Sequence, residues 1–200
     1  MKPYWSFLIV YLTVLLTSCA SNIAQPPQEW PKAASLPSDT CINLTGSYIN
    51  KAVEAPTNAD ADWHKKSPSW SIYLSELFVP YIPTRDFVEH KWADTIEVSG
   101  VEGGKLEIIL KKNNKKIFNK ILNENVEFTC SPQGLVMKGR SSPDNMMGIT
   151  ERFEERTFAK AVDGSILVSE QETDVGIIMF IPYGGRVIQH YKFLPVDAPK

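Results

Sequence analysis

Most of this chain has the period of two between apolar and polar residues that is typical of β-strands. Residues 95–98 and 106–110 alternate as half-buried strands do. The pattern continues over residues 117–122, 126–130 and 135–138. In the stretch 126–130 it places Cys130 on the inward face. We therefore predict a mainly β fold, an antiparallel meander that forms a barrel or a sandwich.

Turn signals separate the predicted strands at short intervals. Residues 111–116 predict a hairpin tip, because the two asparagines at its centre tolerate positive φ. Residues 131–134 carry proline and glycine at the positions that a turn requires. Asp163-Gly164 is the strongest hairpin signal in the chain, and residues 182–185 predict a further turn.

The C-terminal third gives two more predictions. Residues 175–181 are nearly all apolar, which predicts a central, well-buried strand. Residues 152–160 predict a charged strand that contains Phe153 and Phe158, whose odd separation indicates a β-bulge.

One helix is expected. Ser67 is suited to be its N-cap, and Pro68 to be its first helical residue. Apolar residues then recur at helical spacing up to Pro80: Trp70, Tyr73, Leu74, Leu77 and Phe78. We expect a helix of about three turns that covers the core.

The N-terminal region has a different character. After Lys2, residues 4–16 are almost wholly apolar, a length that fits the hydrophobic region of a signal peptide, whereas a spanning helix needs about 20 apolar residues. The run ends in Leu16-Thr17-Ser18-Cys19, which resembles the lipobox of bacterial lipoproteins. The alternatives are an ordinary secretory signal with an incidental cysteine, or an uncleaved anchor.

The lipobox resemblance implies a signal peptide over residues 1–18 and lipid attachment at Cys19, with diacylglyceryl on the thiol and an acyl chain such as palmitate on the new amine. In that family an aspartate after the cysteine retains the protein in the inner membrane, and Ala20 stands there instead. The resemblance therefore implies a periplasm-facing protein of the bacterial cell envelope, anchored in the outer membrane.

Residues 19–40 are expected to form the lipidated N-terminus and a semi-rigid tether, because prolines disfavour helix and sheet. These prolines are Pro26, Pro27, Pro31 and Pro37. Trp30 could dock on the domain or lie at the lipid headgroups.

Residues 41–200 are expected to form a single β-rich domain. Its opening stretch, residues 41–48, resembles the first strand of many uncharacterised β-rich bacterial lipoproteins. Gly46-Ser47-Tyr48 is also similar to the Gly-x-Trp start of lipocalins. That second resemblance implies a closed barrel whose apolar pocket is lined by inward residues such as Tyr48, Ile108, Phe128 and Ile178.

Cys41 and Cys130 are left as a pair once Cys19 is lipidated. Export would place them in an oxidising compartment, so we expect a disulfide between them. The alternative is two buried free thiols that pack as small apolar side chains.

Charge and chemistry exclude several classes of function. The formal net charge of −2 gives no footprint for nucleic acid and no strong attraction to an anionic membrane surface, so the lipid on Cys19 is the expected membrane contact. His64, His90 and His190 lie far apart, with no metal-ligand spacing. Residues 58–64 resemble a calcium loop, but Trp63 stands where that loop needs glycine, which favours a solvated loop.

Two charged stretches remain. Glu151, Glu154 and Glu155 alternate with Arg152 and Arg156, which predicts a solvated, ion-paired face in preference to a pair of catalytic carboxylates. The lysines at the hairpin tip predict protection of a sheet edge, with contact to lipopolysaccharide or peptidoglycan as the alternative: Lys111, Lys112, Lys115 and Lys116.

These observations favour a non-enzymatic protein without metal or cofactor that acts by binding or interaction in the envelope. The alternative is a lipocalin-like carrier of a small apolar ligand.

Overall fold

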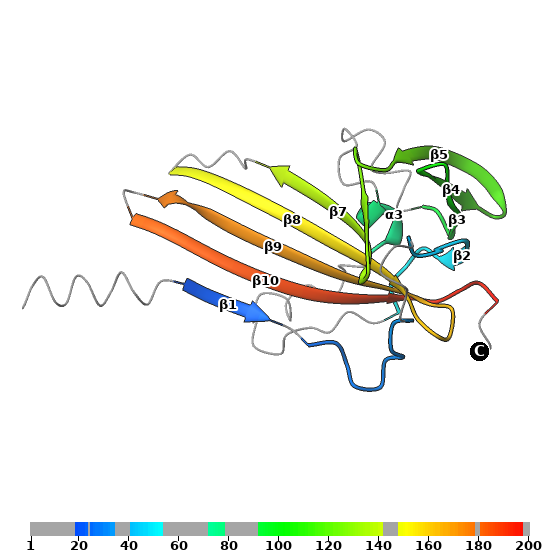
Figure 1. Cartoon of the computed structure of the whole chain (residues 1–200), viewed down its shortest axis with the longest axis horizontal. Helices are drawn as coiled ribbons and strands as arrows, with labels where there is room; N and C mark the ends of the chain where they lie inside the picture. Colours follow the sequence, from blue (N-terminus) through cyan, green and yellow to red (C-terminus); the bar gives the residue numbers. More distant parts are fainter. Residues whose placement is uncertain are drawn as a thin grey trace, which may run out of the picture.

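The computed structural model describes residues 19–23, 25–34, 41–53, 72–78, 92–141, 148–178 and 181–197. The fold is mainly β with one short helix, as predicted, and the described strands form two separate sheets instead of one closed barrel (Figure 1). One sheet has the order β1-β10-β9-β8-β7-β6 and the other β2-β3-β4-β5. The sandwich alternative therefore describes the arrangement better than the barrel.

The four-stranded sheet is an antiparallel meander. Its strands are β2 (Gly46–Ile49), β3 (Thr95–Glu102), β4 (Lys105–Lys112) and β5 (Lys115–Asn123). The alternation predicted for β4 is confirmed, because Leu106, Ile108 and Leu110 are all fully buried. Positive φ angles of 48° at Asn113 and 61° at Asn114 confirm the hairpin tip between β4 and β5.

The six-stranded sheet is antiparallel except at one edge, where β1 runs parallel to β10. Its strands are β1 (Cys19–Ile23), β6 (Thr129–Ser131), β7 (Gly134–Ser141), β8 (Gly148–Lys160), β9 (Ile166–Ile178) and β10 (Ile181–Phe193). The turns expected at residues 131–134 and at Asp163-Gly164 are confirmed, since they join β6 to β7 and β8 to β9.

The bulge expected in β8 is wrong. β8 pairs with β7 and β9 in unbroken register along its length. Phe158 is fully buried and Phe153 is 40% exposed, because an odd separation places two side chains on opposite faces of a regular strand.

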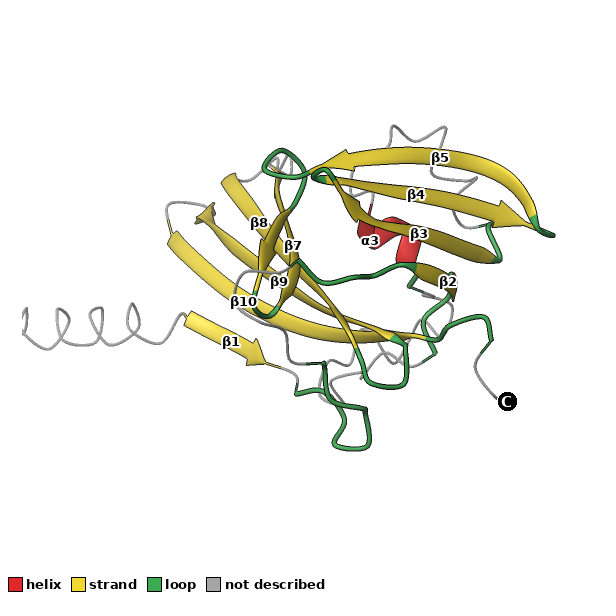
Figure 2. Ribbon diagram, turned by 45° about the vertical axis from the view of Figure 1, so that its right-hand side comes forward, coloured by secondary structure: helices red, strands yellow, loops and turns green. Residues whose placement is uncertain are grey.

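The expected buried strand over residues 175–181 and the turn over residues 182–185 are also wrong. Val175 and Ile177 end β9 with exposed side chains, and Gly184 pairs with Val175 inside β10. Val175 and Ile177 are exposed because this end of β9 lies beyond the part of the sheet that the second sheet covers (Figure 2).

The strand expected to begin at Val126 begins at Thr129 instead. Residues 125–127 form a turn, closed by a hydrogen bond of 2.7 Å that the Asn125 amide donates to the Phe128 carbonyl. Val126 is 80% exposed at this turn. Asn125 has a positive φ of 63°, a conformation that asparagine tolerates better than most residues.

The apolar core lies between the two sheets and contains the helix α3 (Leu74–Phe78). Four of its five residues are buried, and the ring of Phe78 stacks on that of Phe158 with 4.2 Å between centroids. The helix is thus inserted into the core. Its expected start at Ser67 and end at Pro80 lie outside the described residues, as does the calcium-like stretch 58–64.

The expected disulfide between Cys41 and Cys130 is present. It joins the segment before β2 to β6, the edge strand of the other sheet, and both cysteines pack against the core. The bond therefore ties the two sheets together at one edge.

Parts of the N-terminal segment, which was expected to be a semi-rigid tether, pair with the six-stranded sheet. The backbone of Cys19–Ile23 forms β1, and Ala33 makes a bridge to Ala161 just beyond β8. The Ala34 amide also donates a hydrogen bond of 2.8 Å to the Lys160 carbonyl. The pairing residues lie on either side of the prolines at 26, 27 and 31, which lack a backbone donor, so residues before Cys41 can still join the sheet.

Candidate functional site

β8, β9 and β10 run well past the four-stranded sheet (Figures 1 and 2). We call this part the sheet extension: residues 148–156, 170–178 and 181–189. On the face that continues from the core, the row Phe158, Val168 and Tyr191 is buried and mostly apolar. The next row toward the extension begins with Arg156 and Glu170. The sheet face thus changes from core to charged surface within one pair of residues.

Arg156 and Glu170 form the inner part of a charged cluster. The Nε of Arg156 lies 2.6 Å from Oε1 of Glu170, and its guanidinium also reaches Oε2 of Glu154 at 2.8 Å. Glu170 is 8% exposed, and Tyr191 donates its hydroxyl to Oε2 of Glu170 at 3.1 Å. Burial, and then the charge of Glu170, raise the pKa of Tyr191, so its hydroxyl stays protonated.

Arg152 and Asp174 form the outer part of the cluster. Two hydrogen bonds of 2.8 and 3.3 Å join the Arg152 guanidinium to the two oxygens of Asp174. Glu172 lies between the inner and outer parts, 3.9 Å from Arg152. Burial raises the pKa of Glu172, and the negative charge of Glu170 raises it further.

The cluster contains four carboxylates and two guanidinium groups, so its formal charge is negative. We name it the ionic ladder, with members Arg152, Glu154, Arg156, Glu170, Glu172 and Asp174. The prediction of ion pairs on β8 is confirmed, but the inner pair, Arg156 with Glu170, is almost buried instead of solvated, and alternation divides the three expected carboxylates. Glu154 joins the ladder, while Glu155 lies on the opposite face with Lys138 at 3.1 Å.

The sequence patterns used above did not identify the three acidic residues of β9 as members of a charged cluster. Their signal is in the sequence, since Glu170, Glu172 and Asp174 recur with a period of two and so share one face of a strand. Each of these carboxylates lies within 4 Å of an arginine of β8, so the two strands share one ion-paired cluster.

Glu172→Gln is expected to raise the stability at neutral pH. A raised folded-state pKa means that folding favours the protonated carboxyl, so this contribution is fully present below the ordinary pKa of 4.5 and is lost as pH rises through the raised value. Glutamine mimics the protonated form. In urea unfolding, the variant should be more stable than the parent at pH 7 and equal to it at about pH 3.5.

Glu155→Gln is the matched control for Glu172→Gln. Glu155 lies on the other face of β8 in an exposed pair, so its replacement should cost less than about 1 kcal/mol at pH 7. A loss of stability in Glu172→Gln at pH 7 would contradict the cause assigned to the raised pKa.

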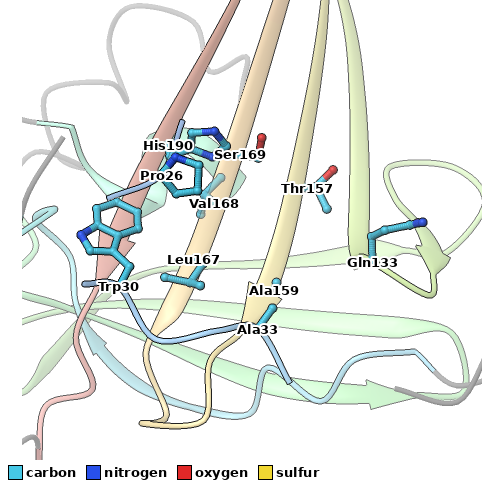
Figure 3. A pocket seen from close by; sticks show the side chains of 10 residues that line it. All are labelled: Pro26, Trp30, Ala33, Gln133, Thr157, Ala159, Leu167, Val168, Ser169 and His190. Atoms are coloured by element: carbon cyan, nitrogen blue, oxygen red, sulfur yellow. The ribbon is translucent and has the colours of Figure 1, made fainter. Parts of the chain in front are cut away.

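The face of the six-stranded sheet opposite to the ionic ladder carries a shallow pocket (Figure 3). Trp30 and Pro26 close it from the N-terminal segment, and Leu167 and His190 lie on the sheet below them. Trp30 therefore docks on the domain, the first of its two expected placements. The volume is about 200 Å³, below the roughly 300–1,000 Å³ of pockets for drug-sized ligands.

The residues expected to line a carrier pocket are packed instead. Tyr48, Ile108 and Phe128 are buried members of the core. The Tyr48 hydroxyl donates to the Leu44 carbonyl at 2.9 Å, and burial raises the pKa of Tyr48 to about 12. Only the backbone of Ile178 is described, at the end of β9.

The described part of the chain was predicted to hold no metal site among its histidines, and its lysines to protect a sheet edge. No group of three or more His, Cys, Asp or Glu residues there could hold a metal ion, and His64 and His90 lie outside that part. Lys111 forms an ion pair with Glu97. Lys112 lies 4.9 Å from the centre of the Trp92 ring.

Cys19 is the first residue of β1, and its Cα pairs with that of Gly184, the fourth residue of β10. In the parts of the chain that the structure describes, no helix is long and apolar enough to cross a membrane. No protein-family model, no curated protein and no solved structure matches this chain.

Proposed function

We propose that the chain is a lipoprotein of the bacterial envelope, acylated on Cys19, facing the periplasm from the outer membrane and acting by binding a partner without catalysis. The observation that carries the proposal is the position of Cys19. Cys19 ends the run Leu16-Thr17-Ser18-Cys19 that resembles a lipobox, and its backbone begins the strand β1 of the six-stranded sheet. The Cys41–Cys130 disulfide supports an oxidising compartment.

A binding role is favoured over catalysis by the composition of the ionic ladder. Its carboxylates are held by arginines or by Tyr191, and it contains no histidine, serine or cysteine to act as base or nucleophile. A carrier of a small apolar ligand is the second candidate, on the resemblance of residues 46–48 to lipocalins. The packing of Tyr48, Ile108 and Phe128 in the core favours the interaction protein.

Acylation is tested by growing bacteria that express the chain with radioactive palmitate. The parent should be labelled, and Cys19→Ser should lose all label, because the thiol is the first acceptor. Cys130→Ser is the control and should keep its label, since that cysteine lies in β6. Label retained on Cys19→Ser would overturn the lipoprotein proposal.

The two binding roles are separated by what accompanies the native protein on purification. Mass spectrometry should find an envelope protein that is retained after mild cross-linking. An apolar small molecule extracted in about equimolar amount would favour the carrier instead.

A further inference from the structure

Apolar side chains are exposed at the end of the sheet extension farthest from the four-stranded sheet. Val175 and Ile177 are 40% and 53% exposed, and they share one face of β9 because they are two residues apart. Pro182, the partner of Ile177 in β10, is exposed as well. Contiguous exposed apolar patches occur at contact surfaces, and these residues are neighbours in the sheet. We name these three residues the apolar tip.

The sequence around the apolar tip carries no charge. From Val175 to Gly185 there is no Asp, Glu, Lys or Arg, although this stretch includes the reversal between two surface strands. Hairpin ends in contact with water are normally polar. The composition is therefore suited to an apolar environment.

The strand register places Cys19 beside the apolar tip. Cys19 pairs with Gly184, and Gly184 pairs with Val175, so the three Cα atoms lie in one row. Since neighbouring strands are about 4.8 Å apart, the Cα of Cys19 is about 10 Å from that of Val175. Figure 1 shows the start of β1 on the same side as the free ends of β8, β9 and β10.

We propose that the apolar tip lies in the headgroup region of the bilayer that holds the acyl chains of Cys19. The inference rests on the proposed acylation. For its chains to insert, Cys19 must lie at the membrane surface, and the headgroup layer is about 5–8 Å deep on each side. The row from Cys19 to Val175 runs across the strands, so both residues lie at the depth of that layer when the row lies along the membrane surface.

This contact fixes the orientation of the domain. β9 has 13 residues, which at about 3.3 Å per residue give it a length of about 40 Å, with the apolar tip near its last residues and the core residues Ile166 and Val168 at its start. The four-stranded sheet and its lysine-bearing hairpin then lie on the side away from the membrane. Glu151 in the row of Val175 and Arg186 two residues beyond Gly184 balance in charge, so the contact does not require anionic lipid.

The test uses the acylated full-length protein in vesicles of pure phosphatidylcholine. The chain has three cysteines, of which Cys19 is acylated and the other two are bonded, so a new cysteine is the one free thiol. An environment-sensitive fluorophore is attached to Ile177→Cys, and to Val126→Cys at the distant turn as control. Nitroxide groups on the lipid acyl chains then act as quenchers.

Label on Ile177→Cys should lose more than about half of its emission, and label on Val126→Cys less than about a tenth. Equal quenching at both sites in protein whose acylation is verified by intact mass would overturn this inference and leave the proposed function standing. A label whose emission is blue-shifted but not quenched by the nitroxides would show that protein, for example a second copy of the chain, covers the apolar tip. That result would also overturn this inference. Unacylated protein would overturn both proposals.

Discussion

Cys130→Ser is expected to lower the free energy of unfolding by about 4–5 kcal/mol. The disulfide closes a loop of sequence separation 89, and the loop contains the helix α3 and all of the four-stranded sheet. Without the bond the unfolded chain gains the entropy of that loop. Because natural domains are stable by about 5–15 kcal/mol, the loss is a large part of the total.

The local structure explains why other contacts do not replace the disulfide. β6 has three residues and pairs with β7 alone, at the edge of the sheet. Cys41 precedes β2, which has four residues. Two short edge segments are thus joined covalently where few hydrogen bonds hold them.

Urea unfolding of oxidised parent, reduced parent and Cys130→Ser measures the effect. The reduced parent and the variant should agree within about 1 kcal/mol, since both lose the same constraint. Cys41→Ser together with Cys130→Ser should match the single variant. Unchanged stability in all of these proteins would show that the loop is already constrained in the unfolded chain.

Local signals in the sequence predicted the hairpins. Asn113 and Asn114 adopt positive φ, and Asp163-Gly164 joins β8 to β9, because residue type alone permits these conformations. The register between β8 and β9 follows from the turn at Asp163-Gly164. Arg156 and Glu170 lie equally far on either side of Asp163, so the ionic ladder was within reach of sequence reasoning once the acids of β9 were read with a period of two.

The misplaced elements depend on contacts between distant parts of the chain. Residues 175–181 are apolar enough for a buried strand, but no local signal shows that the four-stranded sheet stops short of them. The pairing of β1 with β10 is parallel and joins residues more than 160 positions apart. Because no tight turn connects the two strands, the sequence carries no local signal for this pairing. The same non-local contact brings Cys19 to the apolar tip.

Phe158→Ala is expected to lower the free energy of unfolding by about 3–5 kcal/mol. Phe158 is fully buried, its ring stacks on Phe78 of the inserted helix, and its backbone carbonyl lies close to Gly134 in β7. Removal of the ring leaves a cavity between the sheet and the helix. The tight approach at Gly134 limits how far β7 can move to fill that cavity.

Phe153→Ala is the matched control, five residues earlier in the same strand. Its side chain is on the opposite face and 40% exposed, so the same substitution should cost about 1 kcal/mol or less. Urea unfolding of both variants gives the comparison, with circular dichroism to verify that each folds. The unbroken register of β8 requires this difference, because a bulge between the two phenylalanines would put both rings on one face. Similar losses in the two variants would therefore contradict the regular strand as well as the placement of the core.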